Sequence, residues 1–189
     1  MKVFKRVIKY FRSNIHKILT LIFYDNKYLV GVWFEKNNKG WLWGSRNLYN
    51  QKIRGINKHI PWPVSNSIII NGPLENLIVH PDDYDNFQGY GVYYQCFSAK
   101  IIIGKGTQIA NNVGFITANH NPLKVNEHLP GKDIVLGNDC WIGMNVVILP
   151  GVTLGDNTVV GAGSVVTKSF PSGHCIIAGN PAKVLKQLG

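Results

Sequence analysis

Six histidines and three cysteines are the residues of this 189-residue chain that most readily transfer protons, attack carbonyl groups or bind metals. Two of the histidines, His120 and His128, lie in one polar stretch, residues 117–133, which reads TANHNPLKVNEHLPGKD. Imidazole exchanges a proton near neutral pH, so a histidine in such a loop is a candidate general base. A zinc site needs closely spaced ligands on neighbouring elements, and this irregular stretch does not supply them, so we expect no metal.

The cysteines and the composition narrow the class of protein. The three cysteines are odd in number and lack C-x-x-C spacing, which disfavours a disulfide framework or a cysteine zinc site. Hydrophobic residues make up 45% and charged residues 16%, which favours a packed domain over disorder. Residues 1–12 lack the apolar run of a signal peptide, and residues 18–24 are too few to span a bilayer.

A six-residue repeat governs the second half of the sequence. Aliphatic residues are spaced by six at Leu136, Ile142, Ile148, Leu154, Val160 and Val166. Small or β-branched residues stand four places after the first five of these, at Cys140, Val146, Val152, Thr158 and Ser164. An earlier block has the same spacing at Phe97, Ile103, Ile109 and Phe115. A period of six fits neither a helix nor an alternating strand, and it predicts a solenoid of short strands.

The two repeat blocks are out of frame with each other. The interval from Phe115 to Leu136 is not a multiple of six. We interpret residues 118–133 as a loop ejected from the solenoid, and loops on a rigid scaffold often carry function. Outside the repeats, the sequence predicts strands over residues 67–70 and 77–79 and a short closing helix over residues 182–188.

Positive charge is concentrated at the start of the chain. Residues 1–60 hold 13 basic and two acidic residues, a balance of +11, whereas residues 61–189 hold seven basic and eight acidic residues. Within residues 3–22 apolar residues recur at helical spacing, with basic residues on the other face. The apolar face either packs on protein or lies in a membrane interface. We predict a basic N-terminal cap over residues 1–64 and a solenoid over residues 65–189.

Three stretches of the sequence resemble the hexapeptide-repeat acyltransferases. They are ITANHNP (116–122), LGNDCWIGMNVVILPGVTLGDNTVVGAGSVVTKSF (136–170) and IAGNPAKVLK (177–186). The resemblance is strongest to the sugar O-acetyltransferases, which include maltose and galactoside acetyltransferases and enzymes of bacterial surface polysaccharides. It implies a mainly β fold, a left-handed parallel β-helix solenoid, to which the sequence pattern adds an N-terminal helical or irregular cap and a short C-terminal helix.

The same resemblance implies a trimer with active sites between subunits and acetyl-CoA as the acyl donor. His120 matches the catalytic histidine of the family, which deprotonates the acceptor hydroxyl and later returns a proton to the CoA thiolate. The backbone N–H of Met144 is implied as the donor to the oxyanion. Further matches imply CoA-binding positions at Trp141, Ala162, Thr167, Lys168 and Lys183.

Residues for the acceptor are less well marked, because the segment before the first repeat block departs from the family pattern. Relatives use an asparagine and an acid there, whereas this sequence reads YYQCFSAK and offers Gln95. Asn119 precedes the expected catalytic histidine, and Asp83 and Asn86 lie upstream in HPDDYDNFQ. Because amide and carboxylate groups suit sugar hydroxyls, we expect these four residues to bind the acceptor.

These features and the resemblance predict an acetyl-CoA-dependent O-acetyltransferase that acts on a sugar hydroxyl, and the resemblance implies a bacterial surface polysaccharide or its precursor as the setting. Two alternative enzymes are an N-acetyltransferase for an amino-sugar nucleotide and an antibiotic acetyltransferase. A non-enzymatic alternative is a basic module for a membrane or nucleic acid, although no nucleic-acid motif accompanies the basic residues. We expect a homotrimer in the cytoplasm or at the inner face of the membrane, with peripheral membrane contact through residues 3–22.

Overall fold

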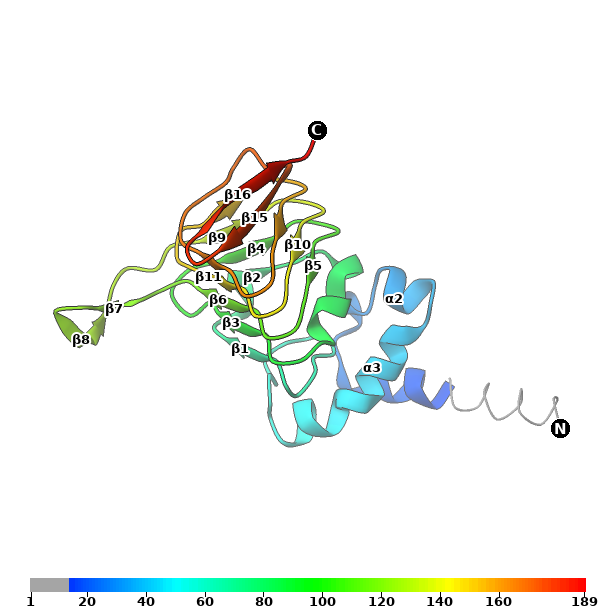
Figure 1. The fold of residues 1–189 in the computed structure, drawn as a ribbon. Helices are drawn as coiled ribbons and strands as arrows, with labels where there is room; N and C mark the ends of the chain where they lie inside the picture. Colours follow the sequence, from blue (N-terminus) through cyan, green and yellow to red (C-terminus); the bar gives the residue numbers. More distant parts are fainter. Residues whose placement is uncertain (1–13) are drawn as a thin grey trace. The chain divides into compact units, whose positions relative to one another are not determined.

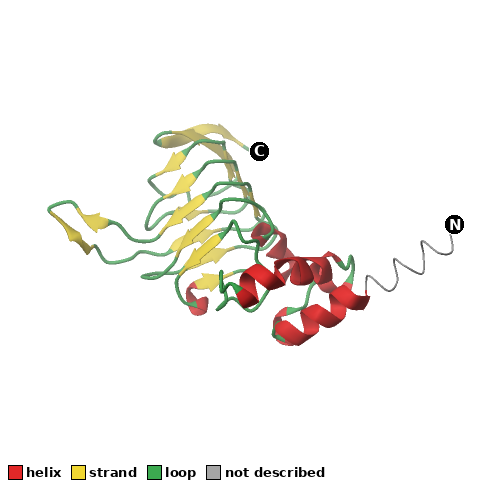
Figure 2. Ribbon diagram, turned by 90° about the horizontal axis from the view of Figure 1, so that it is seen from below, coloured by secondary structure: helices red, strands yellow, loops and turns green. Residues whose placement is uncertain are grey.

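The computed structural model describes residues 14–189, and the chain divides into two compact units, residues 1–66 and 67–189. Figure 1 traces the chain from end to end, and Figure 2 shows the short strands of the second unit stacked in coils. Residues 3–13 of the expected N-terminal helix lie outside the described residues. Between residues 14 and 189, no helix has the length and apolar character needed to cross a membrane.

The coils of the second unit are built from three sheets of short strands. The first sheet contains β1 (Ile69–Asn71), β3 (Tyr93–Gln95), β6 (Gly114–Ile116), β11 (Val147–Ile148) and β14 (Val165–Val166). The second contains β2 (Leu77–Ile78), β4 (Ile101–Ile103), β9 (Ile134–Leu136) and β12 (Thr153–Leu154). The third contains β5 (Gln108–Ile109), β10 (Trp141–Ile142), β13 (Val159–Val160), β15 (Cys175–Gly179) and β16 (Ala182–Gln187).

Successive strands visit these sheets in a fixed rotation. From β4 onward the chain passes from the second sheet to the third, to the first, and back to the second. Neighbouring strands of the three sheets pair in parallel, except β15 and β16. Two short 3-10 helices, η3 (Leu74–Asn76) and η4 (Pro81–Phe87), interrupt the earliest part of this path. Each circuit of the chain is therefore a three-sided coil stacked on the previous one.

The register shows where the coil is regular and where it is interrupted. Val147 pairs with Val165 and Trp141 with Val159, so one coil takes three of the sixfold repeats. The spacing of paired residues is much larger where residues 117–133 intervene, as for Ile103 and Leu136. The interruption thus lengthens that one coil.

The repeat positions form the core of the second unit, as predicted. Each aliphatic residue of the run from Leu136 to Val166 is at most 1% exposed, and the five small or β-branched residues between them are buried as well. In the first sheet, Phe115, Ile148 and Val166 stand beside one another in adjacent coils. The sixfold spacing arises because each of the three faces of a regular coil contributes one such position.

The earliest repeat position is wrong in the sequence interpretation. Phe97 is 37% exposed, whereas Tyr94 is fully buried and stacks on the Phe115 ring, with centroids 5.2 Å apart. Phe87 also contacts the Tyr94 ring, with centroids 5.3 Å apart. These aromatic side chains fill the first coils. Tyr94 pairs with Phe115, and the two residues are more than three six-residue repeats apart in the sequence. Counting back from Phe115 in steps of six therefore reaches Phe97 and misses the true core residue, Tyr94.

The coil corners use residues that tolerate left-handed backbone. Positive φ angles occur between the third and first sheets at Asn112, Asn145 and Gly163. They recur between the second and third sheets at Gly106, Asp139 and Asn157. Glycine, asparagine and aspartate adopt this conformation with little penalty, which explains their repetition in the sequence.

The expected C-terminal helix is absent, and residues 182–187 form strand β16 instead. This strand runs antiparallel to β15, with Gly179 opposite Ala182 and Ile176 opposite Lys186. Without β16, the outer edge of β15 would expose a row of unpaired backbone groups. The need to pair that edge overrides the helical pattern of this short segment, because helix propensity is a weak preference.

The described part of the first unit is helical. It contains a helix over residues 14–23, η1 (Asn26–Tyr28), α2 (Val32–Glu35), α3 (Lys39–Leu48) and the π-helical turn η2 (Tyr49–Ile53). Its core holds the aromatic residues Tyr24, Phe34, Trp41, Trp43 and Trp62. The buried Gln51 amide ties this unit together, because it donates to the carbonyls of Ile60 and Trp62 and accepts from the Val64 N–H.

Candidate active site

The segment that interrupts the coils forms a small hairpin. Strands β7 (His120–Asn121) and β8 (Lys124–His128) pair antiparallel, and His120 stands opposite His128. The Asn121 side chain accepts from the Leu123 N–H at 3.0 Å and closes the turn. Figure 1 shows this β7–β8 hairpin standing away from the stacked coils of its unit. The hairpin presents its side chains to solvent, and Leu123 is 92% exposed.

Strand pairing places two imidazoles in contact at the root of the hairpin. The ring centroids of His120 and His128 are 4.2 Å apart, with an angle of 36° between the planes. The Phe97 ring meets the second imidazole, that of His128, edge-on at 5.5 Å. Both imidazoles remain exposed, so the His120 ring is accessible to a substrate while the His128 ring restricts its orientation.

Hydrogen bonds fix the two chain segments that lead into and out of the hairpin. The Leu129 N–H donates to the Asn119 carbonyl at 2.8 Å, and the Lys132 N–H donates to the Thr117 carbonyl at 2.9 Å. The Ala118 N–H donates to Gln95 Oε1 at 3.0 Å. Gln95 therefore helps to hold the backbone just before His120, an arrangement that the expected role in sugar binding did not anticipate.

A pocket of about 430 Å³ opens beside this hairpin root. Its walls come from the hairpin segment and from two successive coils, at Asn119, Leu129, Pro130, Lys132, Leu149, Pro150 and Thr167. The pocket combines proline and leucine surface with an amide, a hydroxyl and an ammonium group. Such a lining suits an extended ligand with both apolar and polar parts.

The predicted site residues fall into two groups on the coils. We call the first the His120 corner, which lies between the first and second sheets and holds Gln95, Asn119, His120, Thr167 and Lys168. The second, the Met144 corner, lies on the third sheet and the turn from it to the first, and it holds Trp141, Met144, Ala162 and Lys183. Within one chain the first sheet separates the two corners.

Close stacking of coils shapes the Met144 corner. The Met144 carbonyl accepts from the Gly163 N–H at 2.8 Å in the next coil. A Cβ atom at Gly143 would lie 2.7 Å from the Ala162 backbone nitrogen, so only glycine fits there. Trp141 is 59% exposed and Met144 is 46% exposed, which leaves an apolar surface open to solvent. This corner therefore offers an exposed backbone turn beside a large aromatic ring.

Two expected acceptor residues, Asp83 and Asn86, are corrected by the structure. Both are buried. The Asp83 carboxylate accepts from the Gly106 N–H, while Asn86 donates to the Thr107 carbonyl and accepts from the Ile109 N–H. These bonds join η4 to the coil corner before β5, so both side chains are occupied in the fold and have no surface for a sugar.

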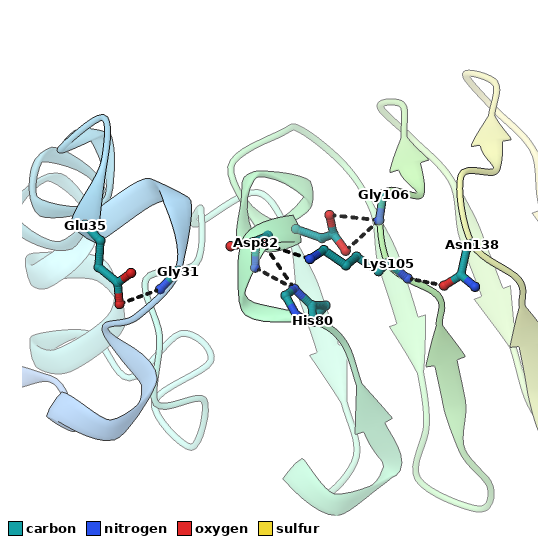
Figure 3. A network of polar contacts seen from close by, with 8 residues as sticks. Gly31, Glu35, His80, Asp82, Lys105, Gly106 and Asn138 are labelled. Carbon is teal, nitrogen blue, oxygen red and sulfur yellow. Dashed lines mark hydrogen bonds and ion pairs between the residues drawn. The ribbon is translucent and has the colours of Figure 1, made fainter.

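Figure 3 shows the polar contacts around that corner. Asp82 forms an ion pair with Lys105 at 3.2 Å, and the Lys105 N–H donates to the Asn138 side chain of the next coil. Burial raises the pKa of the Asp83 carboxyl despite its hydrogen bond from Gly106. The acidic segment thus ties the early coils together through these contacts.

The three cysteines lie in the interior of the second unit. All three cysteines are free and buried, and burial raises the pKa of the Cys96 thiol to about 11. The described residues contain no cluster of three or more groups able to hold a metal ion. The contact between the two hairpin imidazoles was missed from the sequence, because the spacing of His120 and His128 becomes informative only once the hairpin register is known.

Comparisons with known proteins agree with this architecture. Residues 133–168 match the family described as bacterial transferase hexapeptide (six repeats). The galactoside O-acetyltransferase of Escherichia coli is 37% identical over 128 residues, which cover 60% of this chain and 62% of that protein. A protein of Lysinibacillus sphaericus named "probable macrolide acetyltransferase" is 40% identical over 125 residues, which cover 55% of this chain and 67% of that one.

A solved structure gives the same result. A hexapeptide-repeat-containing acetyltransferase of Vibrio cholerae, complexed with acetyl coenzyme A, is 31% identical with a TM-score of 0.50. The match covers 65% of this chain and 61% of that chain. Across these three relatives the similarity thus extends over between 61% and 67% of their lengths. From the repeats, the three-sided coils and these similarities, the chain belongs to the family of hexapeptide-repeat transferases.

Proposed function

We propose that this protein transfers the acetyl group of acetyl-CoA to a sugar hydroxyl. The observation that carries the proposal is the exposed imidazole of His120, next to a pocket that Asn119 and Thr167 line. Similarity to a galactoside O-acetyltransferase supports a sugar as the acceptor, and similarity to an acetyltransferase complexed with acetyl-CoA supports the donor. A surface polysaccharide or its precursor is the acceptor that we propose.

The proposed reaction needs one base and one oxyanion donor. His120 removes the proton of the acceptor hydroxyl as its oxygen attacks the thioester carbonyl. The tetrahedral intermediate collapses with cleavage of the carbon–sulfur bond, and the histidine returns the proton to the CoA thiolate. The backbone N–H of Met144 stabilises the negative oxygen of the intermediate.

The remaining predicted positions would hold the donor. Small residues at Gly143 and Ala162 let an extended pantetheine arm approach the backbone. Lys168 and Lys183 are exposed, so their ammonium groups can meet the phosphates of CoA. Trp141 supplies an aromatic wall near the thioester.

We propose that the active site forms between chains of a trimer. His120 and Met144 lie at different corners of one chain, so a reaction that uses both requires a second chain to bring its Met144 corner against the His120 corner. A cyclic trimer satisfies this demand three times with one type of contact. We also propose that the coils of this chain wind in the left-handed sense of the family and that the protein is located in the cytoplasm.

An antibiotic acetyltransferase is the second candidate, because the Lysinibacillus sphaericus relative carries that name. It uses the same donor and the same base, and it differs only in the acceptor. Asn119 and the pocket beside it would then meet an antibiotic hydroxyl in place of a sugar.

The test is release of free thiol from acetyl-CoA with a panel of acceptors. The panel holds galactosides, maltose, polysaccharide fragments, an amino-sugar nucleotide and a macrolide. We expect the carbohydrates with free hydroxyls to give turnover, and His120→Ala to lower it by about 100-fold or more. Turnover with the macrolide alone would favour the second candidate, and near-normal turnover by His120→Ala would refute the assigned base.

A further inference from the structure

The helix over residues 14–23 turns its polar side toward the rest of the first unit. Thr20 Oγ1 donates to the Trp41 carbonyl at 3.0 Å, and Ser45 Oγ lies 2.7 Å from His16 Nδ1. Gly44 allows the close approach, because a Cβ atom there would collide with the Thr20 side chain. Residues four apart on a helix share one face, so the buried face of this helix is the one that carries His16 and Thr20.

The opposite face of the same helix is apolar and open to solvent. Ile15 is 53% exposed, Ile18 is 55% exposed and Ile22 is 66% exposed, and Leu19 lies beside them. These four residues follow the helical spacing of a single stripe, which we call the isoleucine stripe. An amphipathic helix on the surface of a folded unit normally buries its apolar face and exposes its polar face. A contiguous apolar stripe that faces outward therefore indicates a binding surface.

Positive charge accompanies this stripe. Residues 14–66 hold eight basic residues and two acidic ones, a balance of +6. Lys17 lies over the Trp41 ring at 5.3 Å and Lys52 over the Tyr24 ring at 4.3 Å, so both cations lie close to the helix. Burial, and then the charge of Lys58, lower the pKa of Lys52.

We propose that the isoleucine stripe inserts into the surface of a membrane that contains anionic lipids. The stripe enters the boundary between headgroups and acyl chains, while basic residues of the same unit meet lipid phosphates. A second copy of this chain would bring another surface of the same positive charge against the first, so charge complementarity favours lipid. Such binding would hold the transferase at the face of the membrane where lipid-linked glycans occur, and this part of the inference rests on the proposed function.

The test is flotation of the full chain with vesicles. We expect the protein to float with vesicles of phosphatidylcholine containing about 30% phosphatidylglycerol and to stay in solution with phosphatidylcholine alone. The variant Ile18→Glu/Ile22→Glu places two acidic groups in the stripe and should lower the bound fraction by about tenfold or more. Leu123→Glu, a similar change at an exposed residue of the other unit, should leave flotation unchanged.

Two further measurements keep the outcomes distinct. Circular dichroism and thiol release with a soluble acceptor show whether the stripe variant remains folded and active, independently of lipid binding. Light scattering shows whether the stripe variant changes the number of chains in the assembly. A wild type that floats with neither vesicle, a stripe variant that floats as the wild type does, or a change of assembly in place of lipid binding would each overturn the proposal.

Discussion

At the scale of residues, the environment of His120 depends on aromatic contacts. The His128 ring lies against it at 4.2 Å, and Phe97 packs edge-on against His128. Ring contacts of this kind contribute about 0.5–1.5 kcal/mol each, enough to favour one orientation of an exposed side chain. His128 is therefore a positioning residue for the proposed base.

Removing the His128 ring should slow the reaction and leave donor binding intact. We expect His128→Ala to lower kcat by about tenfold without changing KM for acetyl-CoA, because misorientation of the base affects the chemical step. His128→Phe keeps a ring in contact and should restore most of kcat. The measurement is steady-state thiol release for the three proteins, and equal kcat values for the alanine and phenylalanine variants would contradict the ring contact.

Asp83 should make stability depend on pH. Burial raises the pKa of this carboxyl in the folded chain above its usual value of 3.8. Its contribution to stability is fully present below the unfolded pKa and is lost as pH rises through the folded pKa, since the folded state holds the proton more tightly. Asp83→Asn keeps an acceptor for the Gly106 N–H but has no proton to lose.

The expected result is a change of Tm with pH that the variant lacks. The Tm of Asp83→Asn minus that of the wild type should become more positive between about pH 3.5 and pH 7. Asp82→Asn is the matched control, because Asp82 forms an ion pair with Lys105 and retains partial exposure. A Tm difference for Asp83→Asn that stays constant over this range would show that the buried carboxyl does not titrate as described.

At the scale of elements, the sequence predicted what burial dictates. The sixfold run from Leu136 to Val166 located the strands of the regular coils because every repeat buries the same two positions. The sequence pattern failed where contacts between distant parts of the chain determine the local structure. Residues 182–187 pair with an open sheet edge, and Tyr94 replaces Phe97 in the core because the first coils deviate from three repeats a turn.

The helix over residues 14–23 shows a further limit of pattern reading. Its apolar stripe was recognisable in the sequence, but the stripe alone fits either packing against protein or contact with a membrane. Which face is buried within its unit depends on Thr20, whose hydroxyl reaches the carbonyl of Trp41, far along the chain. No local pattern encodes such a partner, so the orientation of the helix emerges only from the fold.

Because the hairpin segment is an addition to a regular coil, the coils should fold without it. Deleting residues 118–132 joins Thr117 to Asp133 and restores the spacing of paired residues found in the neighbouring coils. We expect the shortened chain to keep its circular dichroism spectrum and a Tm within about 5 °C of the wild type, and to lose turnover with the proposed base.

Its control is His120→Ala in the full-length chain, which removes the same imidazole but keeps the hairpin. Both proteins should be inactive and folded. A large loss of Tm in the deletion variant alone would mean that the hairpin segment stabilises the coils on which it stands, and turnover by the deletion variant would exclude His120 as the base.

At the scale of the whole molecule, the candidate site is divided between the His120 corner and the Met144 corner. The resemblance implied candidate residues that now lie at both corners, and their assignment to different edges of the coil followed only from the order of the sheets. If two chains complete one site, then a chain with a substitution at the His120 corner and a chain with a substitution at the Met144 corner should restore activity when they assemble together.

Coexpression of His120→Ala and Trp141→Ala chains, separately tagged and purified through both tags, creates this situation. Each variant alone should retain less than about a tenth of wild-type turnover. In every trimer that contains both variants, one of the three sites combines an intact His120 from one chain with an intact Trp141 from another, so the mixture should recover about a third of the wild-type rate. Turnover no greater than the average of the two separate variants would place the whole reaction within a single chain.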